Sequence, residues 1–438
     1  MALSPLSTVI LAVMVLTAEQ SGQLPASSRS TVPQSVPVDA PTTPSPPAPS
    51  SAPASAALQS PAAMTLQSAL DSADMNNRTL IAARLGRAVD LAGIDVARQR
   101  PNPEASYEAA RDTPHQVASL SLPLELGGKL ARRVDVANAT LARTTAELAV
   151  QALDIRRQVR VAYFELVAAS NRVQVTRELR GFAERTRNAA RDRFESGAAP
   201  RLEQLQSELA LAQADNEQEA AQGRLGAARA ALNTLIGRPI DAPADPVDSF
   251  DAGVVPADLA GAIAAHPDIA ALDRAIDEAI ARERLAVVMR KPDPTLSGGV
   301  LLNAQPDFTY GWRFGVAIGI PIFTTHRAEV QVETARLAQL RAERDAKLAA
   351  LTGDVAAAAA RAQAARRQYL RYRDEIIPQL VTIESMAEDS YRSGQTGIAA
   401  FLQALQSARQ VRLTATDAGV EYQSALADLE RALGGPIR

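Results

Sequence analysis

The sequence contains no cysteine, and aromatic residues make up only 4% of its 438 residues. The lack of cysteine excludes disulfide bonds, thiolate metal sites and a cysteine nucleophile; it also excludes a lipid-modified N-terminal cysteine if Met1 is the true start. With so few aromatics and so much alanine, a conventional globular core would be thin, because alanine buries little area. Alanine, leucine, arginine, glutamate and glutamine dominate instead, which is typical of long helices.

Strong charge of one sign is also missing. The formal net charge is −3 and there is no basic arm, so nothing indicates a nucleic-acid partner. No nucleophile–base constellation is visible, and Gly127-Gly128-Lys129 lacks the frame of a phosphate loop. None of the three histidines has a second ligand at the spacing of a zinc site. We therefore expect no enzyme, no cofactor and no resident metal. The histidines are His115, His266 and His326.

A long segment is present twice. Residues 194–240 align without a gap on 391–437, so that Ser196-Gly197 meets Ser393-Gly394 and Leu232 meets Leu429. Upstream, Leu122-Pro123-Leu124 pairs with Ile320-Pro321-Ile322. The repeated unit has about 190 to 200 residues, far longer than a solenoid repeat. This duplication predicts one architecture with internal pseudo-symmetry.

The N-terminal region has a different composition. Residues 6–17 are apolar and have the length of a signal-peptide core, too short to span a bilayer as a helix, although residues 1–5 carry no positive charge. We interpret residues 1–20 as a signal peptide. Residues 21–63 are rich in proline, serine, alanine and threonine, and predict a disordered linker.

Helical periodicity covers most of the remainder. We expect helices over 64–100, 130–196, 201–236, 257–290, 327–393 (with a kink at Pro378) and 398–433. A helix of about 65 residues would be roughly 100 Å long. Gly197 and Pro200 are placed to end one helix and begin the next. The first repeat is 64–240, the connector 241–256 and the second repeat 257–438.

Two short segments alternate with period two instead, and each predicts an antiparallel hairpin: about 103–126 and about 294–321. The clearest strand, 310–320, has aromatic and branched side chains on one face and mostly glycine and alanine on the other. An apolar face of this kind fits lipid. Four strands cannot close a barrel, for which about eight is the minimum, so several chains would have to share one.

These pieces together resemble the TolC-like outer-membrane channels of tripartite efflux and secretion systems. The resemblance covers residue 64 to the end. It rests on Met64-Thr65-Leu66 at the start, Pro101-Asn102-Pro103 before the first hairpin, and the doubled S-G turn followed by leucines and a closing L-x-G-x-P. The segment 122–129, ending in Gly127-Gly128-Lys129, resembles the cobalt–zinc–cadmium branch of this family.

The resemblance implies a mainly α chain with a membrane β part. Three copies would form a helical tunnel through the periplasm and a shared twelve-stranded barrel in the outer membrane of a Gram-negative bacterium, with residues 241–256 in an equatorial collar. The chain would be the exit duct for heavy-metal cations. Its partners would be two further copies, outer-membrane lipid, a periplasmic adaptor protein and, through the adaptor, an inner-membrane RND pump.

The resemblance also assigns roles to the two turns. Ser196, Gly197, Ala198, Ser393, Gly394 and Gln395 would dock the adaptor, while Gly127, Gly128 and Lys129 would join barrel to helix. Family members often carry an acidic pair that lines the mouth, but this chain has Ala400 and Gln403 there. Glu203, which aligns with Ala400, is the alternative mouth residue; it could equally be a solvated charge on the helix.

Two other functions remain open at this point. The duct could serve drugs or secreted protein instead of metal cations. The chain could also be a periplasmic coiled-coil scaffold without a pore, with its hairpins packed on protein.

Overall fold

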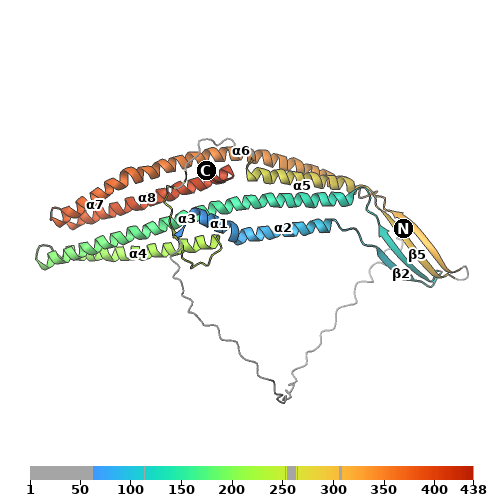
Figure 1. Ribbon diagram of the computed structural model, residues 1–438, viewed down its shortest axis with the longest axis horizontal. Helices are drawn as coiled ribbons and strands as arrows, with labels where there is room; N and C mark the ends of the chain where they lie inside the picture. The colour runs from blue at the N-terminus through green and yellow to red at the C-terminus, as the bar shows by residue number, and fades with distance from the viewer. Residues whose placement is uncertain are drawn as a thin grey trace, which may run out of the picture. The chain divides into compact units, whose positions relative to one another are not determined.

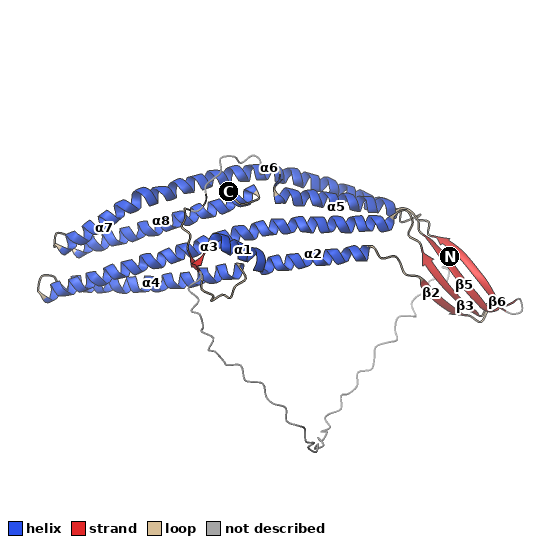
Figure 2. Cartoon of the chain, in the orientation of Figure 1, coloured by secondary structure: helices blue, strands red, loops and turns tan. Residues whose placement is uncertain are grey.

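A computed structural model of the chain describes residues 63–112, 114–251, 253, 263, 265–304 and 308–437. The expected signal peptide, the linker up to residue 62 and residues 254–262 lie outside these ranges. Long helices dominate (Figures 1 and 2). They are α1 (Leu66–Asn76), α2 (Arg78–Ala97), α3 (Lys129–Glu195), α4 (Arg201–Leu235), α5 (Pro267–Met289), α6 (Arg327–Arg371), α7 (Ile377–Arg392) and α8 (Ile398–Leu433).

The strands β2 (Glu104–Ala109), β3 (Gln116–Pro123), β5 (Pro294–Ala304) and β6 (Phe308–Ile318) form one antiparallel sheet in the order β2-β3-β5-β6. They lie within the two segments where hairpins were expected. The register places Ala118 beside Val300 and Gly298 beside Phe314. Each hairpin therefore contributes one inner strand and one edge strand.

The helices that lead to the sheet follow the order of its strands, α2-α3-α5-α6 (Figure 1). Polar contacts fix their register. The Thr144 hydroxyl donates to Asp90 at 2.6 Å between α3 and α2. The hydroxyls of Thr140 and Thr334 donate to carboxylates of α5, at 2.9 Å to Glu278 and 2.8 Å to Glu283. At the other end α3 pairs with α4, and α8 packs on α3, α6 and α7.

The main core lies where the two helical halves meet the connector. A short parallel pair, β1 (Ala63–Met64) with β4 (Asp245–Pro246), ties the chain before α1 to the connector. Phe250 follows this pair and inserts between Phe164 of α3 and Tyr369 of α6, with ring centroids 6.0 and 6.1 Å away. Gly419 of α8 makes room for it, because a Cβ there would lie 2.6 Å from the Phe250 ring.

Two predicted helices are interrupted. The segment 64–100 divides at Asn77, whose extended backbone ends α1 and whose side chain accepts from the backbone of Thr79 and Leu80 to begin α2. The helix expected over 327–393 contains a π-helical turn, η2 (Tyr372–Ile376), just before Pro378. Proline removes one backbone donor and its ring clashes with the preceding turn, which accounts for a wider turn at this place.

The helix expected over 257–290 begins at Pro267 in the part of the chain that the structure describes. His266 is its N-cap, and its ring nitrogen accepts from the backbone of Asp268 at 3.1 Å. At the far ends, Gly197 and Gly394 both adopt positive φ, as expected for residues that follow a helix. The two repeats thus contain the same turn between their long and return helices.

We expect Phe250→Ala to lower the free energy of unfolding by about 3 to 5 kcal/mol, because it empties the space between α3, α6 and α8. Chemical denaturation in detergent, followed by circular dichroism, measures this. Phe323→Ala is the matched control, since Phe323 is 98% exposed and its loss leaves no cavity. Equal losses in the two variants would contradict the role of Phe250 as a core side chain.

Candidate functional site

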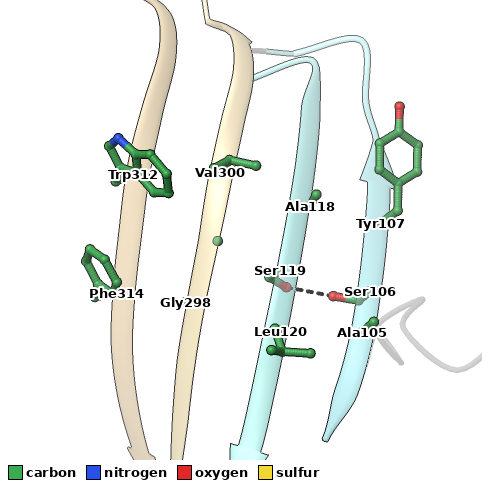
Figure 3. A pocket seen from close by; sticks show the side chains of 11 residues that line it. Ala105, Ser106, Tyr107, Ala118, Ser119, Leu120, Gly298, Val300, Trp312 and Phe314 are labelled. Atoms are coloured by element: carbon green, nitrogen blue, oxygen red, sulfur yellow. Dashed lines mark hydrogen bonds between the residues drawn. The ribbon is translucent and has the colours of Figure 1, made fainter.

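The sheet has one strongly apolar face, and no other described segment of the chain packs on it. On β6, Trp312 and Phe314 are 71% and 81% exposed, and Val316 and Ile318 continue the row. The neighbouring strands add Leu296, Leu120, Leu122 and Tyr107 on the same side. Figure 3 shows Trp312 and Phe314 beside Val300 and Gly298; Gly298 has no side chain, and this part of the face has a hollow of about 550 Å³.

The opposite face is mostly small or polar, with Val117 and Leu301 as apolar exceptions. Its residues alternate with the apolar ones and include Arg313, Gly299 and Ser297. The hydroxyls of Ser106 and Ser119 lie 2.7 Å apart across β2 and β3 (Figure 3). A sheet with one apolar and one polar face can separate hydrocarbon from water.

The junction between sheet and helices is held by buried charge. Gly127 and Gly128 both have positive φ, and Lys129 begins α3 with its side chain buried. The Lys129 Nζ lies 2.6 Å from Asp293, whose other oxygen accepts from the backbone of Leu126 at 3.1 Å. One carboxylate from the second repeat thereby fixes the chain reversal of the first. The family resemblance placed Gly127, Gly128 and Lys129 at this junction, but nothing in the sequence indicated Asp293 as a partner.

At the other end of the helices, the two turns lie over a second small core. Tyr391 of α7 stacks on Phe401 of α8 with ring centroids 5.0 Å apart. Its hydroxyl donates to Glu203 of α4 at 3.0 Å, and Arg193 of α3 lies over the same ring. Four helices are therefore joined through one tyrosine.

This tip cluster, defined as Arg193, Glu203, Tyr391 and Phe401, places the predicted mouth residues. Glu203 is buried against Tyr391 within its own chain, so it is not a solvated charge on the helix surface. Ala400 and Gln403 are exposed. The six predicted docking residues, Ser196, Gly197, Ala198, Ser393, Gly394 and Gln395, are also exposed.

Tyr391, Phe401 and Arg193 were not predicted from the sequence as site residues. A signal was available, because Tyr391 aligns with Phe194 in the duplicated segment and both precede the S-G turn. Only one of these aromatics is buried, however, since Phe194 remains 38% exposed.

Ion pairs extend the connection between the two halves above the tips. Arg412 of α8 reaches Glu178 of α3 at 2.6 Å and Glu384 of α7 at 2.5 Å. Arg409 lies 2.9 Å from Glu217 of α4. The helices near the tips are therefore joined by one buried hydrogen bond and several partly exposed charges, which salt screens more readily.

Within the described ranges, no cluster of histidine, aspartate and glutamate could hold a metal ion. Across the same residues, none of the helices combines the length and apolarity needed to cross a membrane. Of the three histidines, His266 caps α5 and His326 lies 3.2 Å from Glu329.

Comparison with known proteins settles the family. The outer membrane efflux protein family matches residues 69–238 and 259–435, which are the two repeats. The chain belongs to this family. It is an efflux protein of the outer membrane, and the resemblance found in the sequence is confirmed. The family consists of transport channels rather than enzymes.

Individual relatives cover most of the chain. The cobalt-zinc-cadmium resistance protein CzcC of Cupriavidus metallidurans is 27% identical over 380 residues, which are 84% of this chain and 90% of the relative. The solved structure of CusC has a TM-score of 0.69 at 21% identity, covering 85% and 92% of the two chains. The open-state structure of the Neisseria gonorrhoeae outer membrane channel MtrE has a TM-score of 0.67 at 24% identity, covering 85% and 89%. These structures share the fold of this mainly helical chain.

We expect Tyr391→Phe to loosen the tip cluster by about 2 kcal/mol, because it leaves the buried Glu203 carboxylate without this donor. Hydrogen exchange of residues 385–405 should become faster, while Tyr372→Phe, away from the tips, should leave it unchanged. Burial, then the hydrogen bond and charge of Glu203, raise the pKa of Tyr391 to about 12.

The same contact should depend on pH in the wild-type protein. Because the folded state holds the phenol proton more tightly, the stabilisation is complete below the ordinary pKa of 10.0 and is lost as pH rises through about 12. Tyr391→Phe should abolish this dependence at the tips. Tips that exchange at the same rate in both proteins across this range would contradict the assignment.

Proposed function

We propose that three copies of this chain build one exit duct that carries heavy-metal cations across the outer membrane. Each copy contributes four strands to a shared barrel of twelve strands, and its helices to a tunnel that continues into the periplasm. A periplasmic adaptor protein joins the tunnel to an inner-membrane RND pump.

The unpaired edges of the sheet carry this proposal. β2 and β6 each have a strand partner on one side only. Lipid does not tolerate open sheet edges, since their backbone groups would lose water without gaining a partner. One chain cannot close a barrel, because about eight strands are the minimum. Strand β6 of one copy pairing with β2 of the next removes every edge.

The helices support the same assembly. The helices α2 and α6, near the sheet, and α4 and α7, near the tips, carry apolar side chains that no helix in the described part of the same chain covers. A long apolar stripe of this kind requires a partner. These exposed side chains are Leu85, Val89 and Val96 on α2, Val332 on α6, Leu202, Leu205 and Leu209 on α4, and Val381, Ile383 and Met386 on α7.

The choice of cargo rests on the similarity to CzcC, whose name describes cobalt, zinc and cadmium resistance, together with the Gly127-Gly128-Lys129 segment. A duct for drugs or for secreted protein is the competing reading. The exposed turns around Gly197 and Gly394 are the proposed docking surface for the adaptor. The tip cluster, with Ala400 and Gln403 nearby, forms the proposed periplasmic mouth.

Two lysine variants test the duct. Phe314→Lys places a charge on the apolar face and should reduce insertion, because a lysine at the bilayer midplane costs about 2 to 4 kcal/mol. Ala317→Lys places the same charge on the opposite face of the same strand and should still insert. The measurement is single-channel conductance of the detergent-purified protein in a planar bilayer.

Equal behaviour of the two variants would contradict the barrel, and a wild-type protein that stays soluble and never conducts would favour the scaffold.

Cargo needs a separate assay. In cells that hold a metal pump and adaptor but lack a duct, the wild-type chain should restore growth on cobalt, zinc or cadmium. Restored drug resistance without metal resistance would overturn the choice of cargo.

A further inference from the structure

We infer that the junction between sheet and helices binds a phospholipid with an anionic headgroup. The headgroup lies on the junction cations, defined as Arg290, Lys291 and Arg327, and an acyl chain runs along the apolar sheet face into the hollow beside Gly298. This inference rests on the proposed barrel, which sets the sheet in a bilayer.

The three cations lie at one level of the molecule. Thr334 of α6 contacts Glu283 of α5 at 2.8 Å, and the two helices run in opposite directions. Seven residues onward in α5 and seven residues back in α6 lead to Arg290 and Arg327, so these residues lie at the same height. Lys291 follows directly, where the chain leaves α5 for the sheet.

These cations differ from three others at the junction in having no acidic partner in the described part of the chain. Among the described residues, Lys129 is paired with Asp293, Arg132 with Asp135 and Arg133 with Glu125. The exposed side chains of Arg290, Lys291 and Arg327 have no such pair in that part of the chain. The junction therefore presents unbalanced positive charge to whatever surrounds it.

Gly127 leaves room for the side chain of Lys291. Gly127, with φ of +75°, faces the lysine side chain, and a Cβ at this glycine would lie 2.6 Å from the Lys291 Cδ. The missing side chain thus makes room for the aliphatic part of Lys291 to cross the reversal before α3. Long cationic side chains commonly lie along apolar surface in this way, with the charge at the polar boundary of a membrane.

Apolar side chains continue from the cations to the hollow. Ile320, Ile322 and Phe323 precede Arg327, and all three are strongly exposed. The row then passes Ile318 and Val316 and reaches Phe314, which pairs with Gly298. The distance along the strand from Lys291 to Gly298 is about 23 Å at 3.3 Å per residue, comparable with an extended phospholipid acyl chain.

The hollow suits such a chain because its floor is apolar and combines small residues with Leu120 and Val300. Gly298, Ala118 and Ala105 lie on neighbouring strands between Trp312, Phe314 and Tyr107 (Figure 3). It is about 550 Å³ in volume and open along the sheet. Basic sites beside membrane-embedded surfaces bind acidic lipid headgroups, and the apolar hollow adds a place for the tail. A neighbouring copy would cover the edges of the sheet and leave this face to lipid.

The test is a lipid titration of the detergent-purified full chain by native mass spectrometry. Phosphatidylglycerol should bind about tenfold or more tightly than phosphatidylcholine with the same acyl chains, since each cation near the headgroup adds to the attraction. The preference should weaken as salt is raised. Arg290→Gln, Lys291→Gln and Arg327→Gln combined should remove it.

Two further variants separate the effect of the junction charges from that of the hollow for the acyl chain. Arg341→Gln, Arg361→Gln and Arg367→Gln combined make the same change in net charge on α6, away from the junction, and should keep the preference. Gly298→Leu adds a side chain in the hollow, and its Cβ would meet Phe314 at an ordinary 3.5 Å. It should weaken both lipids several-fold and leave their ratio unchanged.

Equal affinity for the two lipids, or a preference that survives the loss of the three junction cations, would overturn the inference. Conductance of the same samples distinguishes failure of the lipid site from failure of the proposed duct. A protein that conducts but does not discriminate between the lipids contradicts the lipid site alone. A protein that neither assembles nor conducts contradicts the proposed duct and the lipid site with it.

Discussion

The unpaired backbone at the two edges of the four-stranded sheet constrains everything else in this chain. The helices α2-α3-α5-α6 follow the same order as the strands β2-β3-β5-β6 to which they lead. The edge strands β2 and β6 therefore correspond to α2 and α6, the first and last helices in this order. Apolar residues such as Trp312 on the sheet and Val89 on α2 remain exposed in a single copy. The open edges and the exposed Val89 side chain support the proposal that a single chain is one sector of a closed structure.

The duplication places similar elements at equivalent positions, but the two halves differ in helix continuity and in the residues they supply at the tips. In the first half α3 is continuous over 67 residues. In the second half the corresponding helix widens into a π-helical turn before Pro378. At the tips the first half supplies Glu203 and Arg193, and the second supplies the aromatic pair Tyr391 and Phe401. The contact that joins the halves thus depends on the positions where the repeats have diverged.

Local signals in the sequence were sufficient for much of this fold. Glycine and proline mark the ends of α3, α4 and α8, and period-two alternation marks β6, because these features act over a few neighbouring residues. The kink expected at Pro378 lies beside the π-helical turn of η2, whereas the break at Asn77 was missed. Asn77 lies inside an unbroken helical period; its side-chain oxygen caps α2, and its amide also donates to the carbonyl of Leu235, 158 residues away, at 2.7 Å.

Contacts between distant segments could not be predicted for the same reason. The connector was recognised from its proline and aspartate content, but nothing local indicates that Phe250 inserts opposite Gly419. Glu203 was singled out by alignment of the repeats. Its burial depends on Tyr391, 188 residues further along the chain. The sequence thus predicted the apolar sheet face and the turns, while the partners of the charged residues required the structure.

Disulfide cross-linking of the two sheet edges tests the central claim most directly, since the chain has no native cysteine. Tyr107→Cys on β2 would be combined in turn with cysteine at 312, 314 and 316 of β6, a series that samples the unknown register between copies. Closure by identical copies predicts that one pair gives covalent dimers and trimers on oxidation. Val300→Cys on the inner strand β5 should give none when combined with Tyr107→Cys. Monomers alone in every combination would contradict the shared barrel.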